Sequence, residues 1–267
     1  MLPGVRETDI PVPDAKNSLW KLNAETIGVY RVAYSPEHLA KLGKAAAQKD
    51  SAFSLEDRVG LVSDAFTLAQ AGYSKTSGGL ALMHAIRGDN SSLVNTAAAL
   101  NLGKLASVWW EQPQPVRDAI NRFRADVFGP MARELTFEFG ANDSSELREL
   151  RETVITAAAS AGDTWTIDEI RRRFAPLQEH GDYSLIHPDL LRTVLSQAVK
   201  HGGEAEYETV MGVYRAPPTP AHKTSAMVAL GTTQDAALIQ RTIEFVFSGQ
   251  VKTQDFMYFF MSLSSNP

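Results

Sequence analysis

The chain has 267 residues, no cysteine and a formal net charge of −5. The missing cysteines exclude disulfides, thiolate catalysis and cysteine-based zinc sites, and the acidic balance argues against nucleic-acid binding, which needs a basic face. No apolar run approaches the roughly 20 residues needed to span a bilayer, and the first residues lack the apolar core of a secretion signal. We therefore expect a cytoplasmic globular protein that binds neither nucleic acid nor membrane.

The first part of the chain predicts a lead-in followed by a short β segment. Residues 1–17 carry prolines and scattered charge without periodicity, which indicates a flexible lead-in. Residues 19–23 and 28–34 are typical of two short strands, the second because its side chains alternate between two faces. We expect residues 18–34 to hold the only β structure in the chain.

From Pro36 onward the pattern is helical almost to the end. Ser54-x-x-Asp57 resembles a capping box that opens an amphipathic helix, and Gly72 lies where a C-terminal glycine would end that helix. Thr166-x-x-Glu169 is a second capping box. Pro188 fits the first turn of another helix, whose buried stripe is expected to be Leu190, Leu191, Val194, Leu195, Ala198 and Val199. Further helices are expected near residues 36–48, 76–87, 91–110, 115–138, 145–160, 188–201, 204–215, 220–230, 234–247 and 253–262.

A dozen helices joined by short turns predict an all-α fold over residues 35–267. We expect stacked antiparallel helix pairs in an irregular HEAT-like α-solenoid, which buries its apolar stripes between neighbours and leaves a concave face exposed. No repeat recurs at a fixed period, which favours an irregular solenoid over a consensus array. A compact helical bundle remains the alternative on periodicity alone.

No residue pattern in the chain predicts catalysis. There is no H-E-x-x-H, no two of the six histidines are four residues apart, and none is followed by Glu. A metal site assembled from distant histidines stays conceivable. The G-x-S-x-G elbow, the P-loop and the G-x-G-x-x-G loop are missing too. The run Arg171–Arg173 reads as a solvated helix face, with a phosphate patch as the alternative. We therefore assign no catalytic or metal-binding residue.

Two dense motifs resemble one family. The first spans Leu19–Tyr34 and the second Asp57–Gly72, and a weaker third match is the final stretch VKTQDFMYFFMSLSSNP. Together they resemble the C-terminal helical domain of puromycin-sensitive-type zinc aminopeptidases, the family that includes aminopeptidase N. The residues that carry the resemblance are Trp20, Asn23, Gly28, Tyr30, Arg31, Tyr34, Asp57, Arg58, Asp64, Phe66 and Gly72.

The resemblance implies a part of an enzyme that removes N-terminal residues from peptides. Zinc would belong to a catalytic domain outside this chain, and the helical domain would cap the active site and shape the peptide cavity. It implies as partners the parent's catalytic and β-sandwich domains and peptide substrates. It also implies that the helical domain is truncated at its C-terminal end, so we expect a fragment that is inactive alone and self-associates through uncovered apolar surface.

Two other functions remain open on the sequence. One is a stand-alone helical-repeat scaffold that binds a protein or peptide, and the other is an accessory subunit that docks onto a separate catalytic chain. No substrate-binding residue can be carried over, because the matched motifs lie at a domain junction. We expect Arg31, Arg58 and Asp64 to form a desolvated charge network there, with Tyr30 and Tyr34 packing their rings at the same place.

Overall fold

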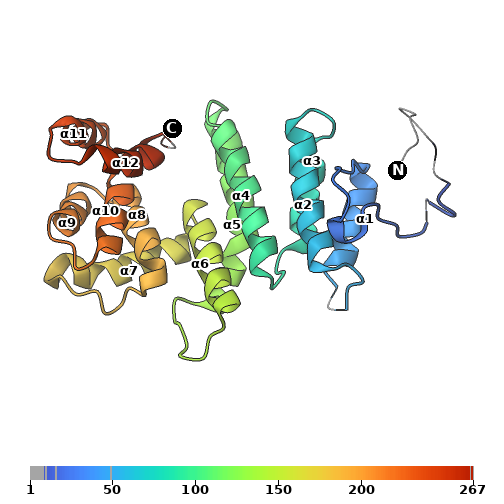
Figure 1. The fold of residues 1–267 in the computed structure, drawn as a ribbon, viewed down its shortest axis with the longest axis horizontal. Helices are drawn as coiled ribbons and strands as arrows, with labels where there is room; N and C mark the ends of the chain where they lie inside the picture. The colour runs from blue at the N-terminus through green and yellow to red at the C-terminus, as the bar shows by residue number, and fades with distance from the viewer. Residues whose placement is uncertain (1–8, 10, 16, 49, 265, 267) are drawn as a thin grey trace. The chain divides into compact units, whose positions relative to one another are not determined.

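The computed structural model describes residues 9, 11–15, 17–48, 50–264 and 266 (Figure 1). All regular structure among these residues is helical, with twelve α-helices and three short 3₁₀ turns. This confirms the all-α class. By its internal contacts the chain divides into two compact units, Met1–Asp89 and Asn90–Pro267.

The described residues of the first unit form three α-helices and one 3₁₀ turn. In chain order these are η1 (Ala24–Thr26), α1 (Pro36–Ala46), α2 (Leu55–Gln70) and α3 (Thr76–Ile86). α3 packs against both α1 and α2, and η1 lies on α2. A Cβ atom at Gly43 would lie 2.9 Å from the Cβ of Ala85, so glycine is what allows α1 and α3 to approach this closely.

The ends of α2 follow the sequence prediction. Ser54 and Asp57 form the expected capping box, in which each side chain accepts from the other residue's backbone N–H. At the other end Gly72 has a φ of 80°, and the amides of Gly72 and Tyr73 donate to the carbonyls of Ala69 and Leu68. These two bonds make a Schellman ending, which needs a residue that tolerates the left-handed region.

The two strands predicted at residues 19–23 and 28–34 are wrong. The described residues form no strand there, and the segment runs irregularly on both sides of η1. Its backbone groups are satisfied in another way: the amides of Glu25 and Val32 donate to aspartate side chains of α2. A segment whose buried polar groups find side-chain partners needs no neighbouring strand.

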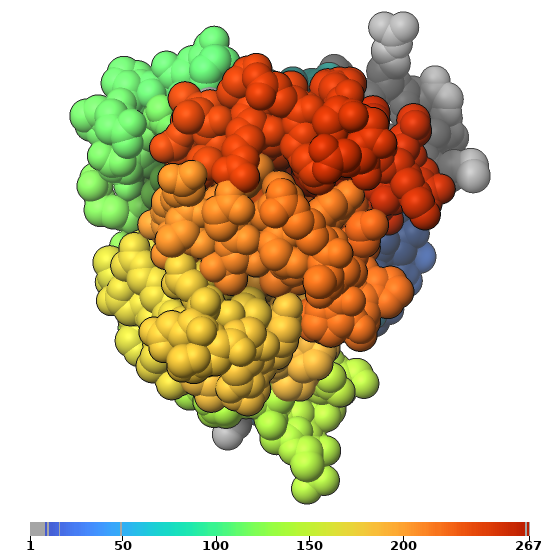
Figure 2. Space-filling model, turned by 90° about the vertical axis from the view of Figure 1, so that its left-hand side faces the viewer, coloured from blue at the N-terminus to red at the C-terminus, as the bar shows by residue number. Residues whose placement is uncertain are grey.

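The second unit contains the other nine α-helices among the described residues. They are α4 (Ser92–Val108), α5 (Gln114–Leu135), α6 (Ser145–Ser160), α7 (Thr164–His180), α8 (Leu191–His201), α9 (Glu204–Arg215), α10 (Pro220–Leu230), α11 (Ala236–Phe247) and α12 (Phe256–Leu263), with η2 (Pro188–Leu190) and η3 (Thr253–Asp255) between them. α6 packs against α4 and α5, and α10 against α8, α9 and α12. Figure 2 shows helices α7 to α12 in successive layers from yellow to red.

Two details of this unit test the sequence reading. The apolar stripe predicted for the helix after Pro188 is confirmed, since Val194, Leu195 and Val199 are each at most 1% exposed. The capping box predicted at Thr166 is wrong. α7 begins two residues earlier, because Asp163 accepts hydrogen bonds from the backbone N–H and the hydroxyl of Thr166. In the described part of the chain, no helix is both long and apolar enough to cross a membrane.

Candidate functional site

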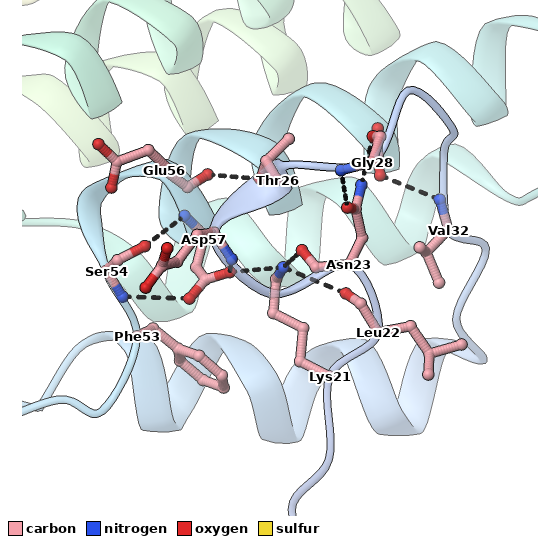
Figure 3. A network of polar contacts seen from close by, with 12 residues as sticks. Lys21, Leu22, Asn23, Thr26, Gly28, Val32, Phe53, Ser54, Glu56 and Asp57 are labelled. Atoms are coloured by element: carbon pink, nitrogen blue, oxygen red, sulfur yellow. Dashed lines mark hydrogen bonds and ion pairs between the residues drawn. The ribbon is translucent and has the colours of Figure 1, made fainter. Parts of the chain in front are cut away.

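The motif residues of the first unit meet at one place, where residues 18–34 lie on α2. We call this place the junction. Its centre is an ion pair between Lys21 Nζ and Asp57 Oδ1, 2.6 Å apart, with each side chain only 8% exposed (Figure 3). The same carboxylate accepts from the amides of Glu25 at 2.7 Å and Ser54 at 3.2 Å. Asp57 thus joins the start of α2 to the segment that precedes it.

Electrostatics at Asp57 favour the charged carboxylate. Burial raises the pKa of Asp57, but the Lys21 ammonium and the amides of Glu25 and Ser54 outweigh burial, so the pKa lies below its usual value. Lys21 also donates to the carbonyls of Asn23 at 2.7 Å and Leu22 at 3.2 Å. Its buried ammonium is therefore fully partnered, as a buried charge must be.

Asn23 closes the segment into a tight loop. Its side chain accepts from the Gly28 amide at 2.7 Å (Figure 3) and donates to the carbonyls of Gly28 and Tyr30 at 3.0 and 3.1 Å. Asn23 itself has a φ of 55°, a region that asparagine tolerates better than most residues. Thr26 then donates to the Glu56 carbonyl, and a Cβ at position 60 would collide with the Thr26 hydroxyl, which explains glycine there.

A second aspartate holds the end of the segment two turns further along α2. Asp64 Oδ1 accepts from Arg31 Nη1 at 2.9 Å, and Asp64 Oδ2 accepts from the Val32 amide at 3.0 Å. Arg31 also donates to the Ser63 hydroxyl. The Arg31 side chain is 46% exposed while that of Asp64 is 15% exposed, so this ion pair is partly screened by solvent.

An aromatic cluster completes the junction on the side of α1. The rings of Trp20 and His38 stack at 4.1 Å between centroids, and Tyr34 lies against both. His38 Nε2 is 2.7 Å from the Trp20 carbonyl oxygen, and the Tyr34 hydroxyl contacts both backbone groups of Leu22. Burial raises the pKa of Tyr34, which keeps the hydroxyl neutral and able to donate.

The remaining motif residues serve the helices rather than the junction. Arg58 pairs with Asp89 at 3.0 Å and not with Asp64, so it lies outside the network expected from the sequence. The ring of Phe66 is buried against α3, where a Cβ at Gly79 would lie 3.3 Å from it. Tyr30 is 57% exposed and does not pack as predicted, unlike Tyr34.

Three residues of the first unit escaped the sequence analysis. Lys21 lies between two motif positions and its partner Asp57 is 36 residues away, so spacing alone gives no sign of the pair. The position of His38 in the first turn of α1, beside an aromatic-rich segment, was the only hint of its stacking. Nothing local marks Asp89 as the partner of Arg58.

A hollow of about 350 Å³ lies beside the junction, between residues 32–34 and the three helices of this unit. Its lining is mostly apolar and includes Val32, Leu61, Leu68 and Tyr73. In the segment that precedes Val32, Ile27 is 78% exposed and Val29 is fully exposed. The junction thus combines a firmly held backbone with apolar side chains that point to solvent, an arrangement that suits packing better than chemistry.

The comparisons with known proteins identify the family of this chain. The family model of the ERAP1-like C-terminal domain matches residues 19–267. The chain belongs to this family. It is 32% identical over 238 residues to the alanine/arginine aminopeptidase of Saccharomyces cerevisiae, which covers 89% of this chain and 27% of that protein. It is 26% identical to the puromycin-sensitive aminopeptidase of Caenorhabditis elegans, covering 90% of this chain and 25% of that protein.

A second yeast relative gives the same picture. The mitochondrial aminopeptidase 2 of Saccharomyces cerevisiae is 31% identical over 247 residues, with 89% of this chain and 24% of that protein covered. The ERAP1-like domain described here therefore spans about a quarter of the length of the curated relatives it matches. This confirms the resemblance on which the motif residues were chosen.

The ERAP1-like domain does not supply a zinc site from its described residues. No group of three or more histidine, aspartate or glutamate side chains is arranged to hold a metal ion there. The histidines serve other contacts: His38 stacks on Trp20, and His187 stacks on Phe139 at 3.7 Å. A zincin needs two imidazoles and a carboxylate around one ion, and this donor set does not fit.

Proposed function

We propose that this chain is the C-terminal helical domain of a cytoplasmic, zinc-dependent aminopeptidase that removes N-terminal residues from peptides. The observation that carries the proposal is the match of the ERAP1-like C-terminal domain over residues 19–267. The names of the relatives, all aminopeptidases, support the activity of the whole protein. Zinc would be held by the parent's catalytic domain, outside this chain, and would supply Lewis-acid chemistry for peptide hydrolysis there.

The helical domain caps the active site, and its contribution is spatial. It forms an irregular HEAT-like solenoid whose concave face shapes the peptide cavity, limits peptide length and excludes water. Support comes from the packing of neighbouring helices, such as α5 on α6 and α9 on α10, within the second unit. In this proposal no side chain of the domain makes or breaks a bond.

Residues 18–34 join the domain to the preceding β-sandwich, residues 1–17 form a lead-in, and residues 35–267 form the helical domain. The exposed side chains of Ile27, Val29 and Tyr30 support this role, because they are apolar and project from a segment whose backbone is tightly held. Such side chains mark a docking face for another part of the protein. The parent's β-sandwich and catalytic domains are then the partners, and peptides are the substrates.

A domain replacement tests the proposal. In a chimera, this chain replaces the matching quarter of the Saccharomyces cerevisiae alanine/arginine aminopeptidase. The hydrolysis of fluorogenic aminoacyl amides by the chimera is compared with hydrolysis by the yeast enzyme from which that quarter has been removed. We expect the chimera to recover activity and Val29→Asp to reduce it. Lys252→Asp, at an exposed position of the second unit, serves as the charge-change control. A chimera that folds but is no more active than the shortened host contradicts the proposal.

The chain alone is expected to be inactive and to self-associate. With zinc and an aminoacyl amide, its turnover should not exceed that of buffer, and chelator-sensitive turnover would contradict this. Phe247, Met257 and Met261 expose apolar surface at α11 and α12, with exposed fractions of 64%, 60% and 59%. Surface of this kind favours association. Sedimentation velocity over a range of concentrations measures it.

A further inference from the structure

The hollow beside the junction has the size and the lining of a small ligand pocket. Its volume of about 350 Å³ lies at the lower end of the roughly 300–1,000 Å³ that small-molecule pockets occupy. Leu39 of α1 and Leu61 and Leu68 of α2 form part of its wall, together with Val32 and Tyr73. The hollow therefore has room for one small molecule with an apolar body.

The start of α1 and the start of α3 meet at this hollow. A Cβ atom at Gly78 would lie 3.6 Å from Leu39 Cδ2 and 4.0 Å from Pro36 Cα. Glu37, in the first turn of α1, and Lys75, directly before α3, line the hollow as well. A negative and a positive side chain therefore border the same apolar space.

Lys75 lies at a place where a helix disfavours a cation. It is the N-cap residue of α3, where Ser, Thr, Asp or Asn is preferred, and its side chain forms no cap. The positive end of the helix dipole adds to the charge of the ammonium and does not offset it. The amides of Thr76 and Ser77 have no intrahelical acceptor and donate to no other described residue. A carboxylate at this place would accept from these amides and pair with Lys75.

A buried hydroxyl next to Lys75 also has no partner. Ser74 lines the hollow, and its Oγ is shielded from solvent without a hydrogen bond to any described residue. Its amide donates to the Leu68 carbonyl, so the backbone is held in place while the side chain can turn between staggered rotamers. Leaving a buried hydroxyl unpaired costs free energy, which a ligand that reaches it would restore.

The Glu37 carboxylate is charged and is not neutralised by the chain. Hydrogen bonds from its own amide and from the Ser35 hydroxyl lower the pKa of Glu37. In the described part of the chain Glu37 forms no ion pair, and neither does Lys75. Exposed charges are ordinary on a surface, but these two border one apolar hollow without pairing with each other.

We propose that the hollow binds a free amino acid with an apolar side chain. The side chain enters between the leucines of α1 and α2, the carboxylate lies at Lys75 and the first amides of α3, and the ammonium lies at Glu37. Such a molecule matches the apolar wall and both charges at once, and both of its charged groups form charge-assisted hydrogen bonds. An aminopeptidase releases molecules of this class, so a role as a product site rests on the proposed function, whereas the binding itself does not.

The test titrates phenylalanine into the full chain by calorimetry. We expect saturable binding with a dissociation constant of about 1 mM or below. Phenylalaninamide lacks the carboxylate and phenylpropanoate lacks the ammonium. Each should bind at least about tenfold more weakly, because each loses a hydrogen bond to a charged group. Glycine, which lacks the apolar side chain, should not bind measurably.

Two variants locate the binding at the hollow. Lys75→Met should weaken phenylalanine binding about tenfold and leave phenylalaninamide binding unchanged. Glu37→Gln should weaken phenylalanine binding and leave phenylpropanoate binding unchanged. Lys44→Met and Glu56→Gln are the matched controls, because both residues are exposed and neither lines the hollow. Glu56 lies in the first turn of α2 as Glu37 does in that of α1.

Thermal unfolding shows whether each variant is folded, and Lys75→Met should not lower the midpoint of the free chain, because a cation is unfavourable at the start of a helix. The proposal is overturned if phenylalanine does not saturate the chain, if phenylalaninamide binds as tightly as phenylalanine, or if Lys75→Met binds phenylalanine as Lys44→Met does. Every measurement uses this chain alone, so a negative result leaves the aminopeptidase proposal to its own test in the chimera.

Discussion

Replacing Asp57 by alanine tests whether the junction holds the first unit together. The substitution removes the partner of Lys21 and the acceptor of the Glu25 and Ser54 amides. Both charged side chains are only 8% exposed, so solvent screens their interaction little. We expect the first unit to lose most of its cooperative stability.

The expected loss in the free energy of unfolding depends on the contacts that Lys21 keeps after Asp57 is removed. Removing one partner of a buried ion pair costs about 3–5 kcal/mol, because the other charge is left buried. Lys21 keeps the carbonyls of Leu22 and Asn23, which favours the lower end, about 3 kcal/mol. Lys21→Met should cost less, since Asp57 keeps two amide donors. The double variant should be more stable than Asp57→Ala alone, because no stranded charge is left.

The measurement is urea unfolding followed by Trp20 fluorescence, in a background in which the other tryptophans are replaced by phenylalanine. Trp20 stacks on His38 within the same unit, so its signal reports this unit. The linear dependence on urea gives the free energy of unfolding. If Asp57→Ala lowers the free energy of unfolding by less than about 0.5 kcal/mol, the effect is that of an ordinary surface substitution, and the buried ion pair does not hold the first unit together.

Acidification provides an internal check on the same carboxylate. The pKa of Asp57 is lowered in the folded state, so its contribution to stability is present above the pKa of an unfolded aspartate. That contribution is lost as the pH falls through the folded pKa. The parent chain should therefore lose more stability on acidification than Asp57→Ala does. Parallel pH profiles would show that the carboxylate is not held in its charged form.

The other predictions concern two further aspartates. Arg58→Ala should lower the free energy of unfolding by about 2–3 kcal/mol, which is less than the full cost of leaving a buried charge without a partner, because Asp89 keeps another contact. An unchanged urea midpoint would contradict the pairing of Arg58 with Asp89. Asp163→Ala should lower the free energy of unfolding by about 2–3 kcal/mol, because this residue caps α7 and also pairs with Arg133 at 2.7 Å. Asp168→Ala on the same helix is the matched control, since its side chain is 71% exposed, and an equal loss in both variants would refute the capping argument.

Local signals in the sequence were sufficient for the helices but not for the junction. The Ser54–Asp57 cap, the glycine ending of α2 and the apolar stripe of α8 each depend on residues within a few positions, and each was found. Residues 28–34 alternate like a strand, yet the conformation of the segment is decided by α2 side chains about 32 residues away. Periodicity carries no information about such partners.

Charge patterns mislead for a related reason. The run Arg171–Arg173 reads as a solvated face, but Arg173 is 5% exposed and donates to Glu169 and to the Leu185 carbonyl. Consecutive helical residues point about 100° apart, so one arginine of three can face the interior while the others remain in water. Which one does so depends on the helices packed around it.

The attachment of residues 18–34 to α2 restricts how the first unit can flex. Glu56 and Asp57 hold the segment in the first turn of α2, through Thr26 and Glu25, and Asp64 holds Val32 two turns further on. A stretch anchored at both places travels with that helix as one piece. A bend between residues 25–32 and α2 would break these hydrogen bonds, so movement of this segment relative to α2 is disfavoured.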